Sequence, residues 1–164
     1  MKHLPIKRAP TFFLKAVIIL IAAVVLALCA FLFPMIYREL WQAPEFSAVI
    51  YPALTGLFAT PLPFFFALIQ AFKLLQYIDH QHAFSERSIE ALSLIKYSAI
   101  AMSILYAACM PLVAVFAELD DAPGAIIIGA AFVCAPLVVA TFAAVLEKLV
   151  QSALALKLEN DLTV

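Results

Sequence analysis

Charged side chains divide this chain into long apolar segments. Four stretches of 21 to 27 residues contain no Asp, Glu, Lys, Arg or His: residues 16–37, 46–72, 97–117 and 122–146. A helix rises about 1.5 Å per residue and the hydrocarbon core is about 30 Å thick, so about 20 apolar residues suffice for one crossing. None of the stretches alternates polar and apolar positions as a membrane barrel strand does. The pattern predicts an all-α membrane protein with four spans.

The predicted fold is a four-transmembrane-helix bundle whose helices extend into the cytoplasm. The spans are placed at approximately residues 14–37, 47–72, 95–116 and 123–146. A cytoplasmic helical extension is expected at residues 147–158, followed by a C-terminal tail at residues 159–164. Because the connecting segments are too short to hold a separate soluble core, residues 1–164 are expected to form a single integral membrane domain.

Local signals place the ends of the last two helices. Ser85 is a typical N-cap residue and is expected to begin the third long helix. Asp121, with Pro123 in the first turn, is a start signal for the fourth. From residue 124 to 158 no helix breaker except Pro136 occurs, which corresponds to roughly 53 Å of helix. The fourth helix is therefore predicted to project beyond the hydrocarbon core.

The projecting part of the fourth helix has an amphipathic pattern. Its apolar positions recur at helical spacing: Val145, Leu146, Leu149, Val150, Ala153 and Leu154. Its polar positions are Glu147, Lys148, Gln151 and Ser152. A stripe of this kind packs on another helix. Two readings stay open, namely packing within the protein's own helices and an open site for a partner.

A proline pair interrupts the second span. Pro61 and Pro63 each remove a backbone donor, so they are expected to break the helical hydrogen bonding there. Hydroxyl groups can satisfy carbonyls freed in this way, and the candidates are Thr55, Thr60 and Thr141. A permanent kink and a gating hinge are both compatible with this pattern.

Small residues at a spacing of four predict close helix contacts. The two pairs are Gly56 with Thr60, and Ala125 with Gly129. Small side chains at this spacing allow helix backbones to approach each other in membranes.

Composition and charge add the orientation. Hydrophobic residues make up 66% of the chain and mean hydropathy is +1.08, which excludes a soluble protein. Nine of the ten Lys and Arg residues precede the first span, lie between spans 2 and 3, or follow span 4, and only Arg38 lies on the other face. Basic residues of short loops stay in the cytoplasm, so both termini are expected there. The net charge of −1 gives no reason to expect direct nucleic-acid binding.

The sequence contains no recognisable catalytic arrangement. No Asp, Glu, Lys, Arg or His lies within the four uncharged stretches, which argues against an ion-coupled transporter. Cys29, Cys109 and Cys134 are far apart in sequence, so no CxxC pair is present for redox chemistry or zinc. The motifs of metalloproteases, phosphate-binding loops and serine hydrolases are also missing. We therefore predict no enzyme activity, no catalytic residues and no cofactor.

The middle loop contains the one arrangement that suggests a metal. His80 and His82, with Asp79 beside them, could supply three ligands. A hydrated connecting loop explains the same residues. No fourth ligand is evident apart from His3 or Glu86, and we predict no metal site.

Two stretches carry a resemblance to a known family. The middle loop contains residues 83–92, Ala-Phe-Ser-Glu-Arg-Ser-Ile-Glu-Ala-Leu, and the chain ends at residues 157–164 with Lys-Leu-Glu-Asn-Asp-Leu-Thr-Val. Together with four spans and this length, the chain resembles the bacterial membrane proteins called domain of unknown function twenty-nine seventy-five. In that family a Phe-Ser/Thr pair opens the third helix and the C-terminus reads Glu-Asn-Asp-Leu-Thr-Ile/Val. An Asn usually stands at the position of Ser88, where this chain departs from the pattern.

The resemblance implies a bacterial inner-membrane location and suggests a role. Members of the family are often encoded beside a small helix-turn-helix regulator, which implies a membrane protein that holds or modulates a cytoplasmic transcription factor. We therefore predict a non-enzymatic regulatory or scaffolding protein that binds a cytoplasmic protein partner. The residues expected to bind it are Phe84, Ser85, Glu159, Asn160, Asp161, Leu162, Thr163 and Val164. The opposing reading is that the tail folds back and caps the protein's own helices.

A second function class stays open. The kinked second span could line a path in a homo-oligomer that transports a neutral or apolar solute, which needs no buried charge. The bilayer itself is the one partner that both hypotheses require.

Overall fold

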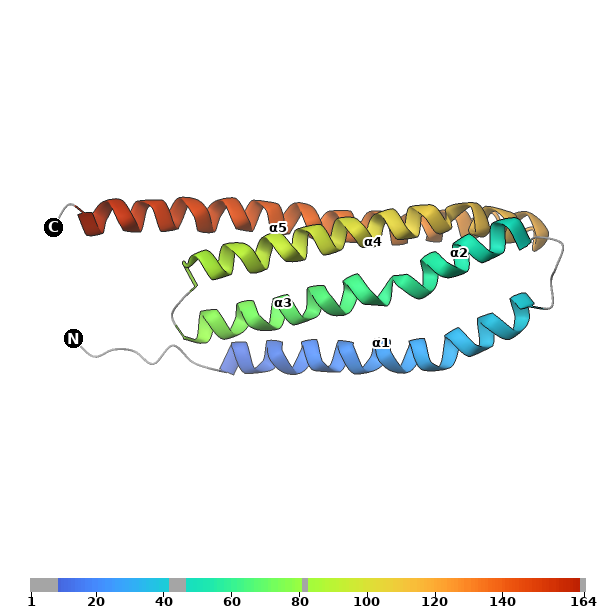
Figure 1. Ribbon diagram of the computed structural model, residues 1–164, viewed down its shortest axis with the longest axis horizontal. Helices are drawn as coiled ribbons and strands as arrows, with labels where there is room; N and C mark the ends of the chain where they lie inside the picture. Colours follow the sequence, from blue (N-terminus) through green and yellow to red (C-terminus); the bar gives the residue numbers. More distant parts are fainter. Residues whose placement is uncertain (1–8, 42–46, 81–82, 163–164) are drawn as a thin grey trace.

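Within the residues that it describes, the computed structural model shows five helices, arranged as four rods (Figure 1). It describes residues 9–41, 47–80 and 83–162, with the backbone alone at residues 9–10, 39–41, 47–50, 53 and 161–162. The helices are α1 (Ala9–Trp41), α2 (Ser47–Ala59), α3 (Pro61–Asp79), α4 (Glu86–Leu119) and α5 (Gly124–Leu162). No strand occurs in the described ranges. The all-α prediction is confirmed.

Four helical segments are long and apolar enough to cross a membrane. They are Thr11–Arg38, Leu54–Asp79, Glu86–Leu119 and Gly124–Asn160. In the first segment, Thr11–Arg38, none of the residues in the most apolar 18-residue window is buried inside the protein. Soluble monomers rarely expose apolar surface on this scale, whereas in a bilayer lipid covers it. The protein is a membrane protein with four candidate spans.

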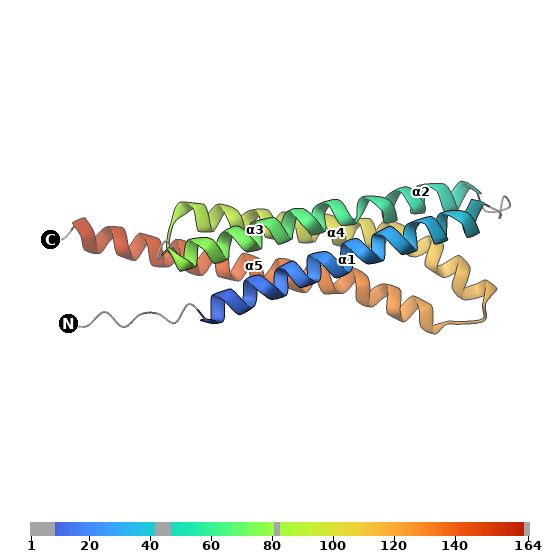
Figure 2. The same ribbon diagram turned by 90° about the horizontal axis from the view of Figure 1, so that it is seen from below.

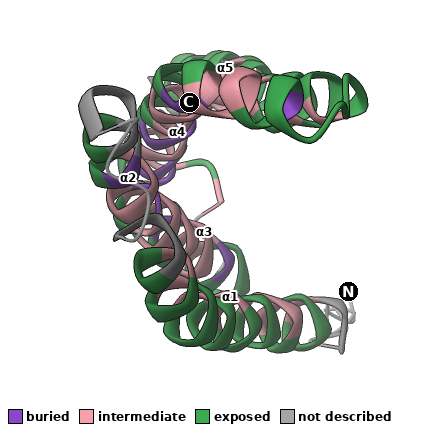
Figure 3. Ribbon diagram, turned by 90° about the vertical axis from the view of Figure 1, so that its right-hand side faces the viewer, coloured by how far each residue is buried: buried purple, intermediate pink, exposed green. Residues whose placement is uncertain are grey.

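The rods form an open arc (Figure 3). α1 packs on α3, α3 and α2 pack on α4, and α4 packs on α5. Viewed end-on, α1 and α5 occupy the two ends of the arc and α4 lies between α5 and the broken α2–α3 rod. The side view in Figure 2 shows the rods running along one common direction. Most buried residues therefore belong to α4 and to its contacts with α3 and α5.

The second rod is broken at the proline pair, as predicted. α2 ends at Ala59, Thr60 stands between the helices, and α3 begins at Pro61. Pro61 has no N–H to give the Leu57 carbonyl, its acceptor in a regular helix. The Thr60 hydroxyl, on a buried residue, donates to that carbonyl at 2.7 Å. Of the threonines expected to satisfy freed carbonyls, Thr60 fills that role.

Close backbone approaches occur at the glycines expected to make them. A Cβ on Gly56 would lie 3.2 Å from the Cys109 Sγ, where α2 meets α4. A Cβ on Gly129 would lie 2.9 Å from the Met110 Sδ, where α5 meets α4. The Ser103 hydroxyl of α4 also donates to the Val133 carbonyl of α5 at 2.8 Å. These contacts confirm the predicted tight packing and centre it on α4.

The turn between α4 and α5 explains where α5 begins. Asp121 has a φ of 49°, in the left-handed region that short polar side chains tolerate. The Ala122 N–H then donates to the Ala117 carbonyl at 2.9 Å, the bond that ends a helix in a Schellman motif. Asp121 thus closes α4, and the next helix begins three residues later at Gly124, after Pro123.

The role of the Thr60 hydroxyl is testable by substitution. Thr60→Val removes the hydroxyl donor at nearly constant shape and leaves the Leu57 carbonyl with only the Thr60 N–H, at 3.3 Å, so we expect a loss of about 1 kcal/mol in stability. The measurement is the thermal unfolding midpoint of the detergent-solubilised protein. Thr60→Ser should retain most of the stability.

Thr55→Val is the matched control for this prediction. The Thr55 hydroxyl donates to the Tyr51 carbonyl at 2.9 Å from an exposed position, and that carbonyl has a regular helical partner in the Thr55 N–H. An equal loss of stability in both valine variants would contradict the assigned role of Thr60.

Candidate functional site

The described charges gather at the two ends of the rods. We call the basic end the one at which α1 begins, α3 ends, α4 begins and α5 ends (Figure 1). Its described basic side chains are Lys15, Lys73, Arg87, Lys96, Lys148 and Lys157. The opposite end carries Arg38, Glu118, Asp120 and Asp121. Polar chemistry in the described ranges is therefore concentrated at the basic end.

Two ion pairs join neighbouring rods at the basic end. Lys15 of α1 pairs with Asp79 of α3. Lys96 of α4 pairs with Glu147 of α5 at 2.7 Å, with side chains only 21% and 15% exposed. The Lys96 Nζ also lies 4.8 Å from the centroid of the Tyr97 ring. The Lys96–Glu147 pair fixes how α5 is rotated about its axis against α4.

That rotation corrects the predicted amphipathic stripe. Glu147 had been placed on the polar face, but it faces α4, together with the partly buried Val150 and Leu154 one and two turns further on. Leu146 and Leu149 point away and are 48% and 60% exposed. The ion pair, and not the apolar pattern, sets the orientation here. Burying a carboxylate without a cation costs more free energy than leaving a leucine exposed to lipid or water.

Phe84 and Ser85 lie in the connection between α3 and α4. Ser85 caps α4, with φ −138° and ψ 158°, and its Oγ accepts from the Ser88 N–H at 3.4 Å. Ser88 is fully buried, and its hydroxyl lies 3.2 Å from that of Ser85. Phe84 is 54% exposed. Ser85 therefore has a structural role, whereas Phe84 presents its ring to the surroundings.

The C-terminal end of α5 projects past the other rods. Figure 1 shows α5 continuing beyond the connection between α3 and α4, and every residue from 155 to 160 is exposed. Glu159 and Asn160 thus lie in a helix that runs past the predicted end at Leu158. Asp161 and Leu162 form its last residues, described by backbone alone, and Thr163 and Val164 lie outside the described residues. The structure places Phe84 and residues 159–162 at one end, but not in one cluster.

A polar cleft between α3 and α4 was missed by the sequence analysis. It measures about 100 Å³ and is lined mainly by Gln70, Lys73 and Tyr77 of α3 and by Arg87 and Glu90 of α4. Gln70 is only 5% exposed. The sequence does contain a signal for this cleft. Polar residues stand at positions 70, 73 and 77, an i, i+3, i+7 spacing that places them on one face of a helix at the charged end of the apolar segment.

The histidine loop forms no metal cluster in the part of the chain that the structure describes. No three His, Cys, Asp or Glu side chains of the described ranges are grouped so as to hold a metal. His80 is exposed, Asp79 pairs with Lys15, and His3 and His82 lie outside the described residues.

Comparison with known proteins places the chain in a family. The family model described as protein of unknown function DUF2975 matches residues 35–164. The uncharacterized membrane protein YoaS of Bacillus subtilis (strain 168) is 49% identical over 160 residues, which cover 96% of this chain and 99% of that protein. No solved structure matches. The chain belongs to the DUF2975 family of membrane proteins, as its loop and C-terminal motifs had suggested.

The Lys96–Glu147 pair yields a prediction about helix docking. Lys96→Met leaves the Glu147 carboxylate part-buried without a cation, so the thermal midpoint of the purified protein should fall by several degrees. The exchanged pair, Lys96→Glu with Glu147→Lys, should recover most of the loss because the attraction is restored. Lys148→Met removes the neighbouring exposed lysine and should change little. A swap no more stable than the single variant would argue against the pair.

Proposed function

We propose that this protein is a multi-pass protein of the bacterial inner membrane with both termini in the cytoplasm. The distribution of basic residues supports this orientation, because nine of ten lie toward the basic end or in the segments that flank it. The similarity to a Bacillus membrane protein supports the bacterial membrane. The basic end is then the cytoplasmic end.

The role that fits this arrangement is regulatory or scaffolding rather than enzymatic. One observation carries it: past the last span, α5 presents an uncovered apolar stripe. Leu149 and Leu156, two turns apart on one face, are 60% and 66% exposed. In the cytoplasm this surface would be in contact with water, and a helix face of this kind docks on an apolar groove or on another helix.

The chemistry of the α5 end indicates which partner it suits. Glu159 and Asp161 carry negative charge. The unpaired carbonyls at a helix C-terminus add a partial negative charge. A basic partner surface next to an apolar groove would complement both features. The DNA-binding face of a small helix-turn-helix regulator has that charge, which agrees with the regulator that the family resemblance implies.

The alternative is a homo-oligomeric component for transport or permeation of a neutral or apolar solute. The open arc in Figure 3 favours it, because α1 and α5 lie apart and a second copy could complete the circle. The uncovered stripe on the cytoplasmic part of α5 favours the docking role, since a path through the membrane does not use it.

Topology is the first test of this proposal. A reporter active only in the periplasm should be active when fused after Asp120 and silent when fused after Val164, because the basic residues hold the basic end in the cytoplasm. Activity after Val164 would place the α5 end in the wrong compartment and overturn the docking role.

The second test concerns the partner. Full-length protein in nanodiscs should bind a purified small helix-turn-helix regulator of the kind that the family resemblance implies, measured by biolayer interferometry. Leu149→Gln with Leu156→Gln should weaken binding by tenfold or more, since burying each leucine is worth about 1.5–3 kcal/mol. Deleting residues 159–164 should also weaken it while leaving membrane insertion intact.

Gln151→Ala with Ser152→Ala is the matched control. These exposed polar side chains lie on the same stretch of α5, and their loss should leave binding unchanged. If the leucine variant binds as well as the wild type, or if the regulator does not bind at all, the docking role fails. A stable homo-oligomer without regulator binding would support the alternative.

A further inference from the structure

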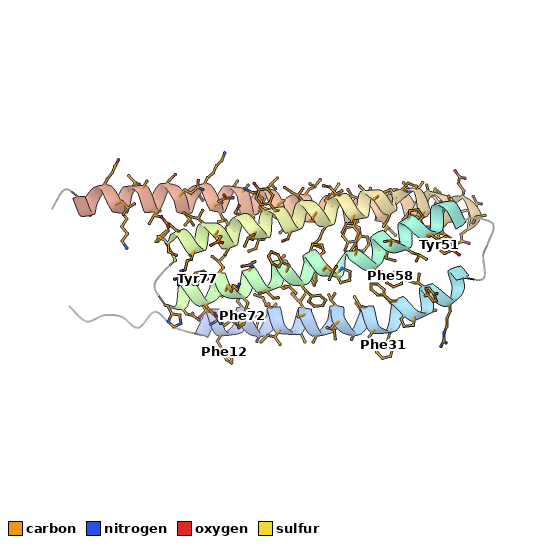
Figure 4. All side chains as sticks on the ribbon, in the orientation of Figure 1. Phe12, Phe31, Tyr51, Phe58, Phe72 and Tyr77 are labelled. Carbon is orange, nitrogen blue, oxygen red and sulfur yellow. The ribbon has the colours of Figure 1, made fainter. Side chains whose placement is uncertain are left out.

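Lys73 lies at the junction of two cavities on α3. One is the polar cleft toward α4, which also contains Tyr77, and the other is an apolar groove toward α1, which also contains Phe72. Figure 4 shows these two side chains on opposite sides of α3 near the basic end. The helical position of Lys73, between these sides, lets one side chain border both cavities.

The polar cleft is lined by an amide from the otherwise buried part of α3. Residue Gln70 is only 5% exposed, and it lines the cleft. Among the described residues no fully buried side-chain nitrogen or oxygen lacks a hydrogen-bond partner, so an amide group of Gln70 that has no protein partner is accessible from the cleft and can donate to water or to a ligand there. Tyr77 lines the same cleft, and its hydroxyl can donate as well. The cleft is thus equipped with donors that the protein itself does not use.

The cationic side chains that line the cleft also form no ion pair with a described residue. Lys15 and Lys96, the other lysines near this level of the rods, each pair with a carboxylate. Lys73 and Arg87 form no ion pair with a described residue, and both line the cleft with the single carboxylate of Glu90. Two cations and one carboxylate leave one positive charge uncompensated. A ligand with one negative charge would balance it.

The apolar groove adds the second half of the ligand. It measures about 490 Å³ and lies within the membrane-spanning part of α1 and α3. Its lining is apolar, with Ile18 of α1 and Phe65 and Phe72 of α3, except for Lys73 and Gln76. Cavities of this size accommodate ligands of several hundred Å³. The groove is apolar along its length and meets a cation at Lys73. A lipid matches this arrangement, because its hydrocarbon chain can lie in the groove while its charged headgroup lies at Lys73.

We propose that the α3–α4 cleft and the α1–α3 groove together bind one phosphatidylglycerol-type phospholipid of the bilayer. The phosphate interacts with Lys73 and Arg87, while the Gln70 amide and the Tyr77 hydroxyl donate to its oxygens. Glu90 accepts from the headgroup hydroxyls. One acyl chain lies in the groove. Basic pockets between helices at the cytoplasmic boundary recognise anionic headgroups in this way, and this site is separate from the docking surface on α5.

The test uses the delipidated full-length protein in a mild, uncharged detergent. Dioleoyl phosphatidylglycerol or dioleoyl phosphatidylcholine is titrated, and both the thermal midpoint and the bound lipid by native mass spectrometry are followed. A ligand that binds the folded state raises the midpoint with its concentration. We expect one phosphatidylglycerol per chain, bound about tenfold more tightly than phosphatidylcholine, as one charge-assisted contact would give. Equal affinity for the two lipids overturns the proposal.

Three variants separate a built site from general surface charge. Lys73→Gln with Arg87→Gln should abolish the preference for phosphatidylglycerol, and Gln70→Leu should reduce it. Lys148→Gln with Lys157→Gln removes two exposed lysines of α5 outside the cleft and should leave it unchanged. Retention of the preference in the Lys73/Arg87 variant, or an equal loss in the Lys148/Lys157 control, overturns the proposal.

Two further ligands test whether the cleft binds the phosphate of a lipid or that of a soluble compound. Lysophosphatidylglycerol, with one chain, should compete with the full lipid because the groove holds a single chain. Soluble glycerophosphoglycerol, which has the same phosphodiester head and no chain, should not compete at equal concentration. Competition by glycerophosphoglycerol as effective as that of the lyso lipid would mean that the cleft binds a soluble phosphate ester, and would overturn the lipid assignment.

Discussion

Backbone hydrogen bonding inside hydrocarbon is the constraint on which this structure depends. No water is available there, so each N–H and C=O must find its partner within the protein, and the four apolar stretches have to be helices. Each proline inside a helix removes one such donor, and the break at Pro61 shows how the loss is compensated. Pro61 leaves the Leu57 carbonyl without its helical donor, and the neighbouring Thr60 hydroxyl supplies one at 2.7 Å. The break between α2 and α3 is stabilised because Thr60, the residue before Pro61, supplies a donor to that carbonyl.

Within that constraint, α4 organises the packing. In a bilayer, apolar surface gains little by leaving lipid for protein, so close contact and hydrogen bonds decide which helices associate. α4 has such contacts on both sides: Cys109 against Gly56, Met110 against Gly129, and the bond from Ser103 to the Val133 carbonyl. α1 contacts α3 through the Lys15–Asp79 pair and α2 through the rings of Phe33 and Phe58, whose centroids are 4.5 Å apart, and it also adjoins α3 across an apolar groove. The result is an arc whose packing centres on α4.

The basic end combines three features with different physical roles. The ion pairs of Lys15 and Lys96 hold neighbouring rods in register. The cleft around Gln70, Lys73 and Arg87 keeps its charges and donors unused by the protein, which suits a headgroup. The end of α5 projects beyond both, with exposed leucines and acidic residues. A lipid bound in the cleft and a protein docked on α5 would act at one membrane face without sharing a residue.

The sequence by itself determined the number of spans, the helical class, the break at Pro61, the cap at Ser85 and the family, because each depends on local chemistry or on residue order. Only the tertiary structure decided which faces of the helices meet. The spacing of Leu146, Leu149 and Val150 predicted one apolar stripe facing a partner helix. In the structure the Lys96–Glu147 pair faces α4, Val150 is partly buried, and Leu146 and Leu149 are exposed. The cleft at Gln70 was likewise invisible, because its residues come from two helices whose pairing depends on long-range contacts. Local patterns report what each helix can bury, and the neighbouring helix determines what it does bury.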